Sequence, residues 1–349
     1  MKRNIRTILT GCVAAAVMGV TFVGGTAQAM TLTVQSSFNA NDFSMNFFKG
    51  VWLPKLAKMT DGRVKMTLLP NGSVVPATQT MDAVANGVLD GDFTSTSYFS
   101  GREPAFALLG DLISGYNTPQ QMQDFCKDGP GAKLLQEAIN EVEGDGKVHA
   151  VACGPYDKEA LPAAVPIPDF AAMKGKKIRA PQGLESAIFA AAGAVPVSIP
   201  FSQVFSALQK GTVDAADASA YINNAKIGLH SVAHYSLYPG ISSMPSMQLT
   251  ISAAKWKEIS PADQKIVRKW WYEAMAALAI EVHKQSQEQA AKDSADGKVH
   301  LIDWSKESRA ELRKVAREQW EVFAKKSPLA QKVLDADLAY MKKLGIEPK

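Results

Sequence analysis

The chain has 349 residues, and its 38 lysines and arginines stand against 34 aspartates and glutamates, for a formal net charge of +4. The first 29 residues carry three of the positive charges and no acid, so the rest of the chain has a net charge of about +1. The two signs of charge are interspersed, as on an ordinary protein surface, which excludes a polycation that binds nucleic acid. Residues 30–349 exceed what one hydrophobic core usually serves, so we expect two lobes.

The amino terminus has the composition of a secretory signal peptide. It has a basic start with Lys2, Arg3 and Arg6, then an apolar run over residues 8–25. An A-x-A cleavage motif follows at Ala27-Gln28-Ala29. We expect cleavage after Ala29 and an exported chain that begins at Met30. A membrane anchor would need about 20 strongly apolar residues, whereas this stretch is rich in Ala, Gly and Thr. A lipoprotein-like box ends at Cys12, but the apolar run follows that cysteine instead of preceding it.

The first half of the exported chain alternates predicted strands with predicted helices. Residues 32–38 alternate apolar and polar side chains, as a half-buried strand does. Asn41 or Asp42 then caps a helix that ends at Asp61-Gly62. Strands at 64–69 and 91–96 and a short helix at 79–86 follow. This alternation predicts open α/β sheets.

The second half repeats the pattern and adds one long helix. Strands are expected at 148–153, 177–180 and 195–199, helices at 186–192 and 202–210, and a polar turn after 213–217. Ser260-Pro261-Ala262-Asp263 then combines an N-cap, a proline at the first helical position and an acid in the first turn. No Gly or Pro follows until Gly297, so a helix of roughly 50 Å is predicted from Pro261 to about Ser294. Such a helix is long enough to span both lobes.

Motifs for catalysis are absent from the sequence. It contains no His-Glu-x-x-His, Gly-x-Ser-x-Gly, Gly-x-Gly-x-x-Gly or Walker-type segment. His230 and His234 have the i, i+4 spacing of metal ligands on a helix, but no third ligand is indicated nearby. Cys126 and Cys153 either form a disulfide, which an exported protein permits, or are two buried free thiols. These features favour binding over catalysis.

Several segments together resemble the DctP-type solute receptors of tripartite ATP-independent periplasmic (TRAP) transporters. They are residues 82–91, 98–109, 173–179, 207–215, 235–239 and 256–261, and the similarity covers nearly all of the exported chain. Ser36-Ser37-Phe38 and Tyr238-Pro239-Gly240 are most similar to the branch that binds 2-oxoacids and related small carboxylates.

The resemblance implies a periplasmic-binding-protein-like α/β fold with two lobes, an interlobe cleft and a long helix that spans both. Placed on this sequence, the first lobe takes residues 30–155 and returns over 245–285. The second lobe takes 156–244 and returns with the C-terminal helices over 286–349. The implied function is a periplasmic receptor that binds a small organic carboxylate (a 2-oxoacid, hydroxy acid or aromatic acid) for a membrane permease driven by an ion gradient.

Arg179 is the first candidate for the binding site. It ends a short predicted strand, where the family carries an arginine that grips a substrate carboxylate. A guanidinium offers two parallel donors that match the two oxygens of a carboxylate. Arg179 and Lys177 share one face of that strand, opposite Ile178, so we expect one of the two cations to point into the cleft. We also expect Arg179→Ala to abolish binding while leaving the fold intact.

Asp217 and Lys158 are candidates that the resemblance implies. Asp217 lies where the oxoacid branch has a glutamate that helps to hold a cation, and Lys158 lies where that branch has a glutamine. An ammonium at Lys158 would replace the metal, so we expect binding without a bound Na⁺ or Ca²⁺. Ala218 replaces a tryptophan of that branch, which implies a roomier pocket.

Further candidates lie on the segments that should border the cleft. Aromatic side chains there supply an apolar wall, and polar ones supply hydrogen bonds to a solute oxygen. They are Tyr98, Phe38, Tyr221, Asn224, Gln182 and Ser37.

Two other functions stay open at this point. The same fold serves receptors for zwitterionic or neutral solutes or for sensor proteins, and an exported enzyme would use the same cleft. The relatives that form dimers do so through a carboxy-terminal extension, whereas this chain stops soon after Tyr340, so we expect a monomer.

Overall fold

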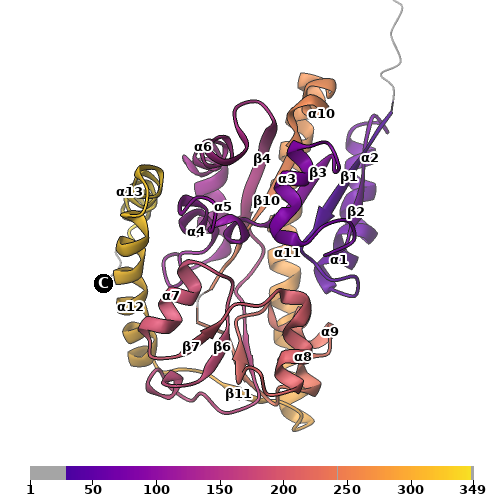
Figure 1. The fold of residues 1–349 in the computed structure, drawn as a ribbon. Coiled ribbons are helices and arrows are strands. Elements are labelled where there is room, and N and C mark those ends of the chain that lie inside the picture. Colours follow the sequence, from indigo (N-terminus) through magenta and orange to yellow (C-terminus); the bar gives the residue numbers. More distant parts are fainter. Residues whose placement is uncertain (1–28, 242, 347–349) are drawn as a thin grey trace, which may run out of the picture.

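Two mixed β-sheets, each flanked by helices, make up the protein (Figure 1). The computed structural model describes residues 29–241 and 243–346, so the predicted signal peptide lies outside the described residues except for Ala29. Within those ranges no helix is both long enough and apolar enough to cross a membrane. The predicted two-lobed α/β fold is confirmed, whereas the exact lobe boundaries stay a prediction.

The first lobe is built on a five-stranded sheet of order β2-β1-β3-β10-β4. Its strands are β1 Met30–Ser36, β2 Val64–Leu69, β3 Gly91–Ser95, β4 Val148–Pro155 and β10 Ser246–Ser252. Strands β1, β2 and β3 are parallel, and β10 is antiparallel to both β3 and β4. The helices of this part are α1 Phe43–Phe47, α2 Leu53–Met59, α3 Thr80–Ala85, α4 Ala105–Gly110, α5 Pro119–Lys127, α6 Gly131–Glu143 and α10 Ala253–Glu258, with a π-helical turn between α1 and α2.

The second lobe has a six-stranded sheet of order β11-β9-β5-β8-β6-β7. Its strands are short: β5 Leu161–Ala163, β6 Lys177–Arg179, β7 Val195–Val197, β8 Ala215–Ala216, β9 Tyr235–Leu237 and β11 His300–Ile302. Its helices are α7 Leu184–Ala191, α8 Val204–Gln209 and α9 Tyr221–Lys226. Single turns of 3-10 helix stand at 77–79, 96–99, 171–173, 201–203 and 229–231.

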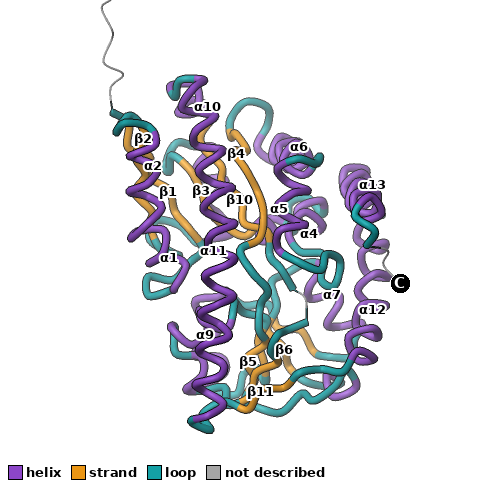
Figure 2. The backbone as a smooth tube through the Cα atoms, turned by 180° about the vertical axis from the view of Figure 1, so that it is seen from behind, coloured by secondary structure: helices purple, strands orange, loops and turns teal. Residues whose placement is uncertain are grey.

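The long helix α11, Pro261–Ala295, runs the length of the molecule, as the sequence predicts (Figure 2). It packs against β4 and α5 of the first lobe and against α9 and β11 of the second. Two further helices follow, α12 Lys306–Ala324 and α13 Pro328–Lys343. Helix α12 contacts α7 and α4, and α13 contacts α4 and α6, so the C-terminal helices also connect the two lobes.

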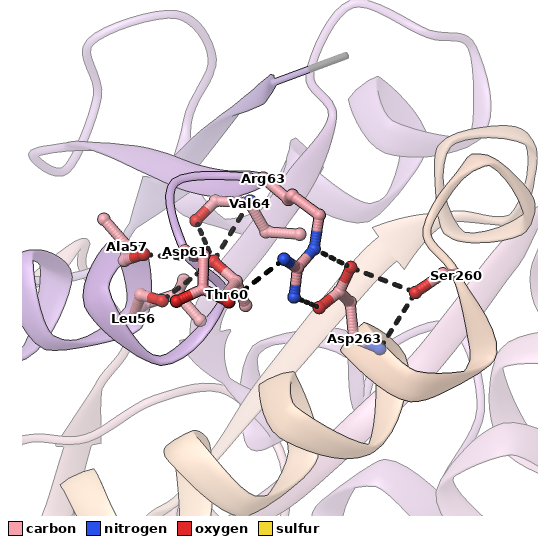
Figure 3. Close-up of polar contacts among 8 residues, drawn as sticks. All are labelled: Leu56, Ala57, Thr60, Asp61, Arg63, Val64, Ser260 and Asp263. Carbon is pink, nitrogen blue, oxygen red and sulfur yellow. Dashed lines mark hydrogen bonds and ion pairs between the residues drawn. The ribbon is translucent and has the colours of Figure 1, made fainter. Parts of the chain in front are cut away.

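The first turn of α11 is fixed to the first lobe by an ion pair (Figure 3). Ser260 Oγ accepts a hydrogen bond from the Asp263 amide at 3.1 Å, as the predicted N-cap requires. Arg63 donates from Nε to Asp263 Oδ2 at 3.0 Å and from Nη2 to Oδ1 at 2.9 Å. The Arg63 guanidinium holds the pKa of the buried Asp263 carboxyl below its usual value.

Aromatic packing under α11 forms the core of the first lobe. Trp271 of α11 lies edge-on to Phe93 of β3, with ring centroids 4.5 Å apart, and Phe48 lies edge-on to Phe93 at 4.9 Å. A disulfide joins Cys126 of α5 to Cys153 of β4, with Cα atoms 5.6 Å apart. This settles the alternative that the sequence leaves open in favour of the bridge, which ties α5 to the edge of the sheet.

Candidate functional site

Arg179 stands at the end of β6 and is 3 % exposed. Its Nε donates to the Ile199 carbonyl at 3.1 Å, and its Nη1 donates to the Asp217 carbonyl at 2.6 Å. Lys177, two residues earlier, is exposed, and its Nζ donates to the Gly211 carbonyl at 2.9 Å. Of the two cations that share a strand face, Arg179 is therefore the one that points inward.

A cavity of about 40 Å³ lies against the Arg179 side chain. Its walls come from both lobes, because residues after β1 and β3 meet residues of β6, α7 and the loops around β8. The lining residues are Ser37, Phe38, Asp42, Ser95, Ser97, Tyr98, Tyr156, Glu159, Arg179, Pro181, Glu185, Phe201, Ala218, Ser219, Pro245 and Met247. This volume admits on the order of three water-sized groups.

A wider cleft adjoins the cavity. It has a volume of about 630 Å³ and shares Tyr98, Arg179, Pro181 and Phe201 with the cavity. The loop 71–78 and residues 98–102 border it on the first lobe, and residues 198–202 border it on the second. A molecule larger than the cavity therefore has room to extend from Arg179 along the boundary between the lobes.

Aromatic side chains form the apolar wall of the cavity. Phe38 lies edge-on to Phe93 at 5.2 Å and to Tyr156 at 6.0 Å, which fixes the loop after β1. Burial raises the pKa of Tyr98, and the charge of Arg179 beside it acts in the opposite direction. The Tyr98 phenol is therefore protonated and available as a hydrogen-bond donor in the cavity.

Buried carboxyl groups surround Arg179. Glu159, Glu185, Asp217 and Asp111 are all buried, and burial is the largest cause of the raised pKa of each, that of Asp111 reaching about 8. Mutual repulsion raises the pKa values of Glu159 and Glu185 further, while the charge of Arg179 lowers them. Burial therefore favours the protonated form of each of these carboxyls over the ionised form.

Asp42 adds another carboxyl to the cavity wall. It is 1 % exposed and caps α1, with Oδ1 accepting from the Ser44 amide at 2.7 Å. Its Oδ2 is buried without a hydrogen-bond partner. Burial raises the pKa of Asp42 to about 7.

The structure brings together five of the nine candidate residues named from the sequence. Arg179, Tyr98, Phe38 and Ser37 line the cavity, and Gln182 lines the wider cleft. Asp217 lies directly behind, since its carbonyl accepts from Arg179 and its amide donates to the Arg179 carbonyl at 2.8 Å. Their role in binding stays a prediction.

Three candidates lie elsewhere. Lys158 lines a separate pocket with Lys306, Arg309 and Arg313, so its expected place beside Asp217 is wrong; Glu159, one residue later, faces the cavity. Tyr221 and Asn224, on α9, do not line the cavity. The Tyr221 hydroxyl donates to Asp293 Oδ2 at 3.0 Å and ties α9 to α11, and the Asn224 amide donates to the Ser219 carbonyl at 2.7 Å.

Sequence reasoning missed seven polar or charged members of the cavity wall: Asp42, Ser95, Ser97, Tyr156, Glu159, Glu185 and Ser219. Glu159 is adjacent to the residue chosen by spacing, so a one-residue shift in a loosely matched segment moved the prediction onto the wrong face. Glu185 is the second residue of α7, which begins two residues before the start predicted for that helix. Asp42 was correctly expected as a helix cap, but a cap gives no sign that its second oxygen faces a cavity.

The donor set does not fit a bound metal. In the described part of the chain, no three His, Cys, Asp or Glu side chains are grouped closely enough to hold an ion. Asp217, the expected ligand, lies beside the carboxyls of Glu185 and Glu159, whose raised pKa values favour the protonated form over the ionised form that a metal requires.

The known proteins to which this chain is similar include periplasmic solute-binding proteins. The chain is 26 % identical over 295 residues to the monocarboxylate 2-oxoacid-binding periplasmic protein of Nostoc, covering 83 % of this chain and 78 % of that protein. It is 34 % identical to a TRAP periplasmic solute binding protein from Rhodobacter sphaeroides, whose apo open crystal structure matches with a TM-score of 0.72 over 91 % of this chain and 99 % of the other.

The fold is also that of a TRAP solute binding protein from Bordetella bronchiseptica solved with calcium and picolinate. That structure matches with a TM-score of 0.80 at 21 % identity, over 91 % of this chain and 93 % of the other. The model of the family called bacterial extracellular solute-binding protein, family 7 (DctP), matches residues 39–327. The chain therefore belongs to this family of solute-binding proteins.

Proposed function

We propose that this protein is the periplasmic receptor of a TRAP transporter and that it binds a small organic carboxylate in the cavity beside Arg179. The observation that carries this proposal is the buried guanidinium at the boundary between the lobes. Two of its five N–H groups donate to backbone carbonyls, which fixes its orientation and leaves further donors for a solute. In a cavity that excludes water, such a charge-assisted contact is stronger than at a surface.

The relatives support a carboxylate as the solute. The Nostoc protein is named for monocarboxylate 2-oxoacids, and proteins of the same fold have been solved with picolinate, malonate and L-malate. Catalysis is not part of the proposal, because the family consists of receptors.

The transport partners and the location belong to the same proposal. Export after cleavage at Ala29 places the receptor in the periplasm, where the liganded form, with its lobes closed, docks on the membrane subunits of the permease. Closure is supported by the two-lobed composition of the cavity wall. We propose a monomer, which light scattering on the purified protein tests directly. Small-angle scattering should show a smaller radius of gyration once a solute is bound.

Binding without a metal is also proposed, with Arg179 rather than Lys158 as the cation that meets the solute carboxylate. Protein treated with a chelator should bind its solute as tightly as untreated protein. Loss of binding on chelation, restored by Ca²⁺ or Na⁺, would refute this part of the proposal alone.

The function is tested by a thermal-shift screen of small carboxylates followed by calorimetry. A solute that binds only the folded state raises the melting temperature according to RT ln(1 + [L]/Kd). Each acid that binds is compared with its primary amide, which keeps the shape but lacks the charge. We expect the acid to bind at least 100-fold more tightly. Equal affinity of acid and amide, or a screen without any carboxylate ligand, would overturn the proposal.

A further inference from the structure

Three carboxyl side chains line the cavity that holds the Arg179 guanidinium. They are Asp42 from the first lobe, Glu159 from the segment that connects the lobes, and Glu185 from the start of α7. All three are at least nine-tenths buried. Among the described lining residues, Arg179 is the only cationic side chain. The cavity wall is therefore richer in negative than in positive groups.

The cavity wall and the residues behind it contain buried hydrogen-bond acceptors that have no donor. Asp42 Oδ2 is buried and has no hydrogen-bond partner, although its neighbour Oδ1 caps α1. Behind the wall, Asp217 Oδ2 also lacks a partner, and it faces the carboxyls of Glu159 and Glu185. A buried acceptor without a donor is costly, so a solute that brings donors to this wall gains affinity.

The aromatic side chains of the cavity wall also favour a cationic group on the solute. Phe38, Tyr98, Tyr156 and Phe201 line the cavity together with the carboxyls. Aromatic rings attract cations through their negative faces. Carboxylates and aromatic faces together form a typical environment for an ammonium group.

We infer that the solute is a carboxylate that also carries a protonated nitrogen, an amino acid whose carboxylate meets Arg179 and whose ammonium group meets Glu159 and Glu185. This inference rests on the proposed function. Arg179 and the two glutamates line the same small cavity, so the two charged groups of the solute lie close together, as in an α- or β-amino acid. The side chain of such a solute extends into the 630 Å³ cleft that shares Arg179 and Tyr98 with the cavity.

Binding of an ammonium group has a measurable consequence for protons. Glu159 faces Asp217, Glu185, Asp111 and Arg179, and Glu185 faces Asp217, Asp111 and Arg179. Burial and this repulsion raise the pKa values of these carboxyls and so favour their protonated forms in the empty cavity. An arriving ammonium group favours the ionised form, so binding releases protons. A 2-oxoacid or hydroxy acid brings no positive charge and releases none.

The experiment compares solutes that differ only at the carbon next to the carboxylate. The 2-amino, 2-hydroxy and 2-oxo acids of one carbon skeleton are titrated by calorimetry in two buffers of different ionisation enthalpy, with chelator and then with Ca²⁺. Skeletons of three to nine carbons are used. We expect the amino acid of the best skeleton to bind at least tenfold more tightly than its partners, with proton release and without need of Ca²⁺.

The outcomes separate the two proposals. An oxo or hydroxy acid that binds as tightly as the amino acid, or an amino acid that binds without proton release, overturns the inference and leaves the proposed function standing. Dependence on Ca²⁺ also overturns it, because the positive partner of the carboxyls is then a metal ion. If no carboxylate binds, the proposed function itself fails, and the inference fails with it.

Two substitutions test the assignment of the acids. Glu185→Gln and Glu159→Gln keep the shape of a protonated carboxyl, so both variants should fold, which their melting curves will show. We expect at least a tenfold loss of affinity for the amino acid and a loss of proton release, with affinity for the 2-oxo acid unchanged or increased. Glu141→Gln, on the exposed face of α6, is the matched control. Unchanged amino acid binding in both variants would contradict the inference.

Discussion

Replacing Arg179 with methionine should affect both folding and binding, because the same guanidinium serves both. The side chain donates to the carbonyls of Ile199 and Asp217, and both bonds are lost in the variant. A hydrogen bond from a charged donor contributes about 1.5–3 kcal/mol, so the two bonds together set a loss of stability of about 3–6 kcal/mol. Proton uptake by Glu159 and Glu185 limits the further cost of removing their counter-charge. We expect a net loss near the lower end of that range.

The loss of affinity for the solute should exceed any apparent loss that arises because part of the variant is unfolded. Removing one partner of a buried, charge-assisted contact costs about 3–5 kcal/mol, which corresponds to roughly 10²–10⁴-fold in Kd. Urea unfolding followed by circular dichroism measures stability, and calorimetry at low temperature measures binding to the fraction that is folded.

Lys177→Met is the matched control, because Lys177 lies on the same strand face but is exposed. It should change stability by no more than about 0.5 kcal/mol and leave binding intact. If Arg179→Met proved as stable as this control, the hydrogen bonds would not carry the stability assigned to them. If it bound the solute normally, Arg179 would not be the carboxylate site.

Three other predictions concern structure away from the cavity. Replacing Cys126 and Cys153 with serine opens a bridge that spans 27 residues and should cost about 3–4 kcal/mol in chemical denaturation; an unchanged midpoint would contradict it. Asp263→Asn should lower the melting temperature by roughly 2–4 °C at pH 7. Because Arg63 depresses the pKa of Asp263, this contribution is present above the unfolded pKa of about 3.9 and disappears as pH falls through the folded value, so a difference from wild type that persists at pH 2 would refute the ion-pair account. Lys158→Gln should bind the solute with unchanged affinity, since Lys158 lies in a different pocket; weaker binding would return it to the site.

Local patterns in the sequence were sufficient for several strands and helices, among them the longest helix. Ser260, Pro261 and the absence of Gly or Pro before Gly297 predicted a helix that the structure places at Pro261–Ala295. Capping and turn residues act over a few positions, so their effects can be read from the chain. Alternation along the strand narrowed the inward-pointing cation to Arg179 or Lys177 for the same reason.

The composition of the cavity was decided by tertiary structure. Glu159, Glu185 and Asp42 are far apart in the sequence and belong to different segments, and only the folded chain brings them to one wall. From the sequence we expected Arg179→Ala to leave the fold intact, because nothing local reveals that Ile199 and Asp217 offer their carbonyls to this side chain; the structure now predicts a loss of stability.

The position of Lys158 shows most clearly what sequence patterns alone do not reveal. The side chains of neighbouring residues in an extended segment point to opposite faces, so a shift of one position exchanges the half-buried ammonium of Lys158 for the buried carboxyl of Glu159. By itself the sequence determined the fold class and the spanning helix, and it predicted Arg179 as the arginine of the site. The charge of the rest of the cavity depended on which faces of distant segments meet, and only the folded chain contains that information.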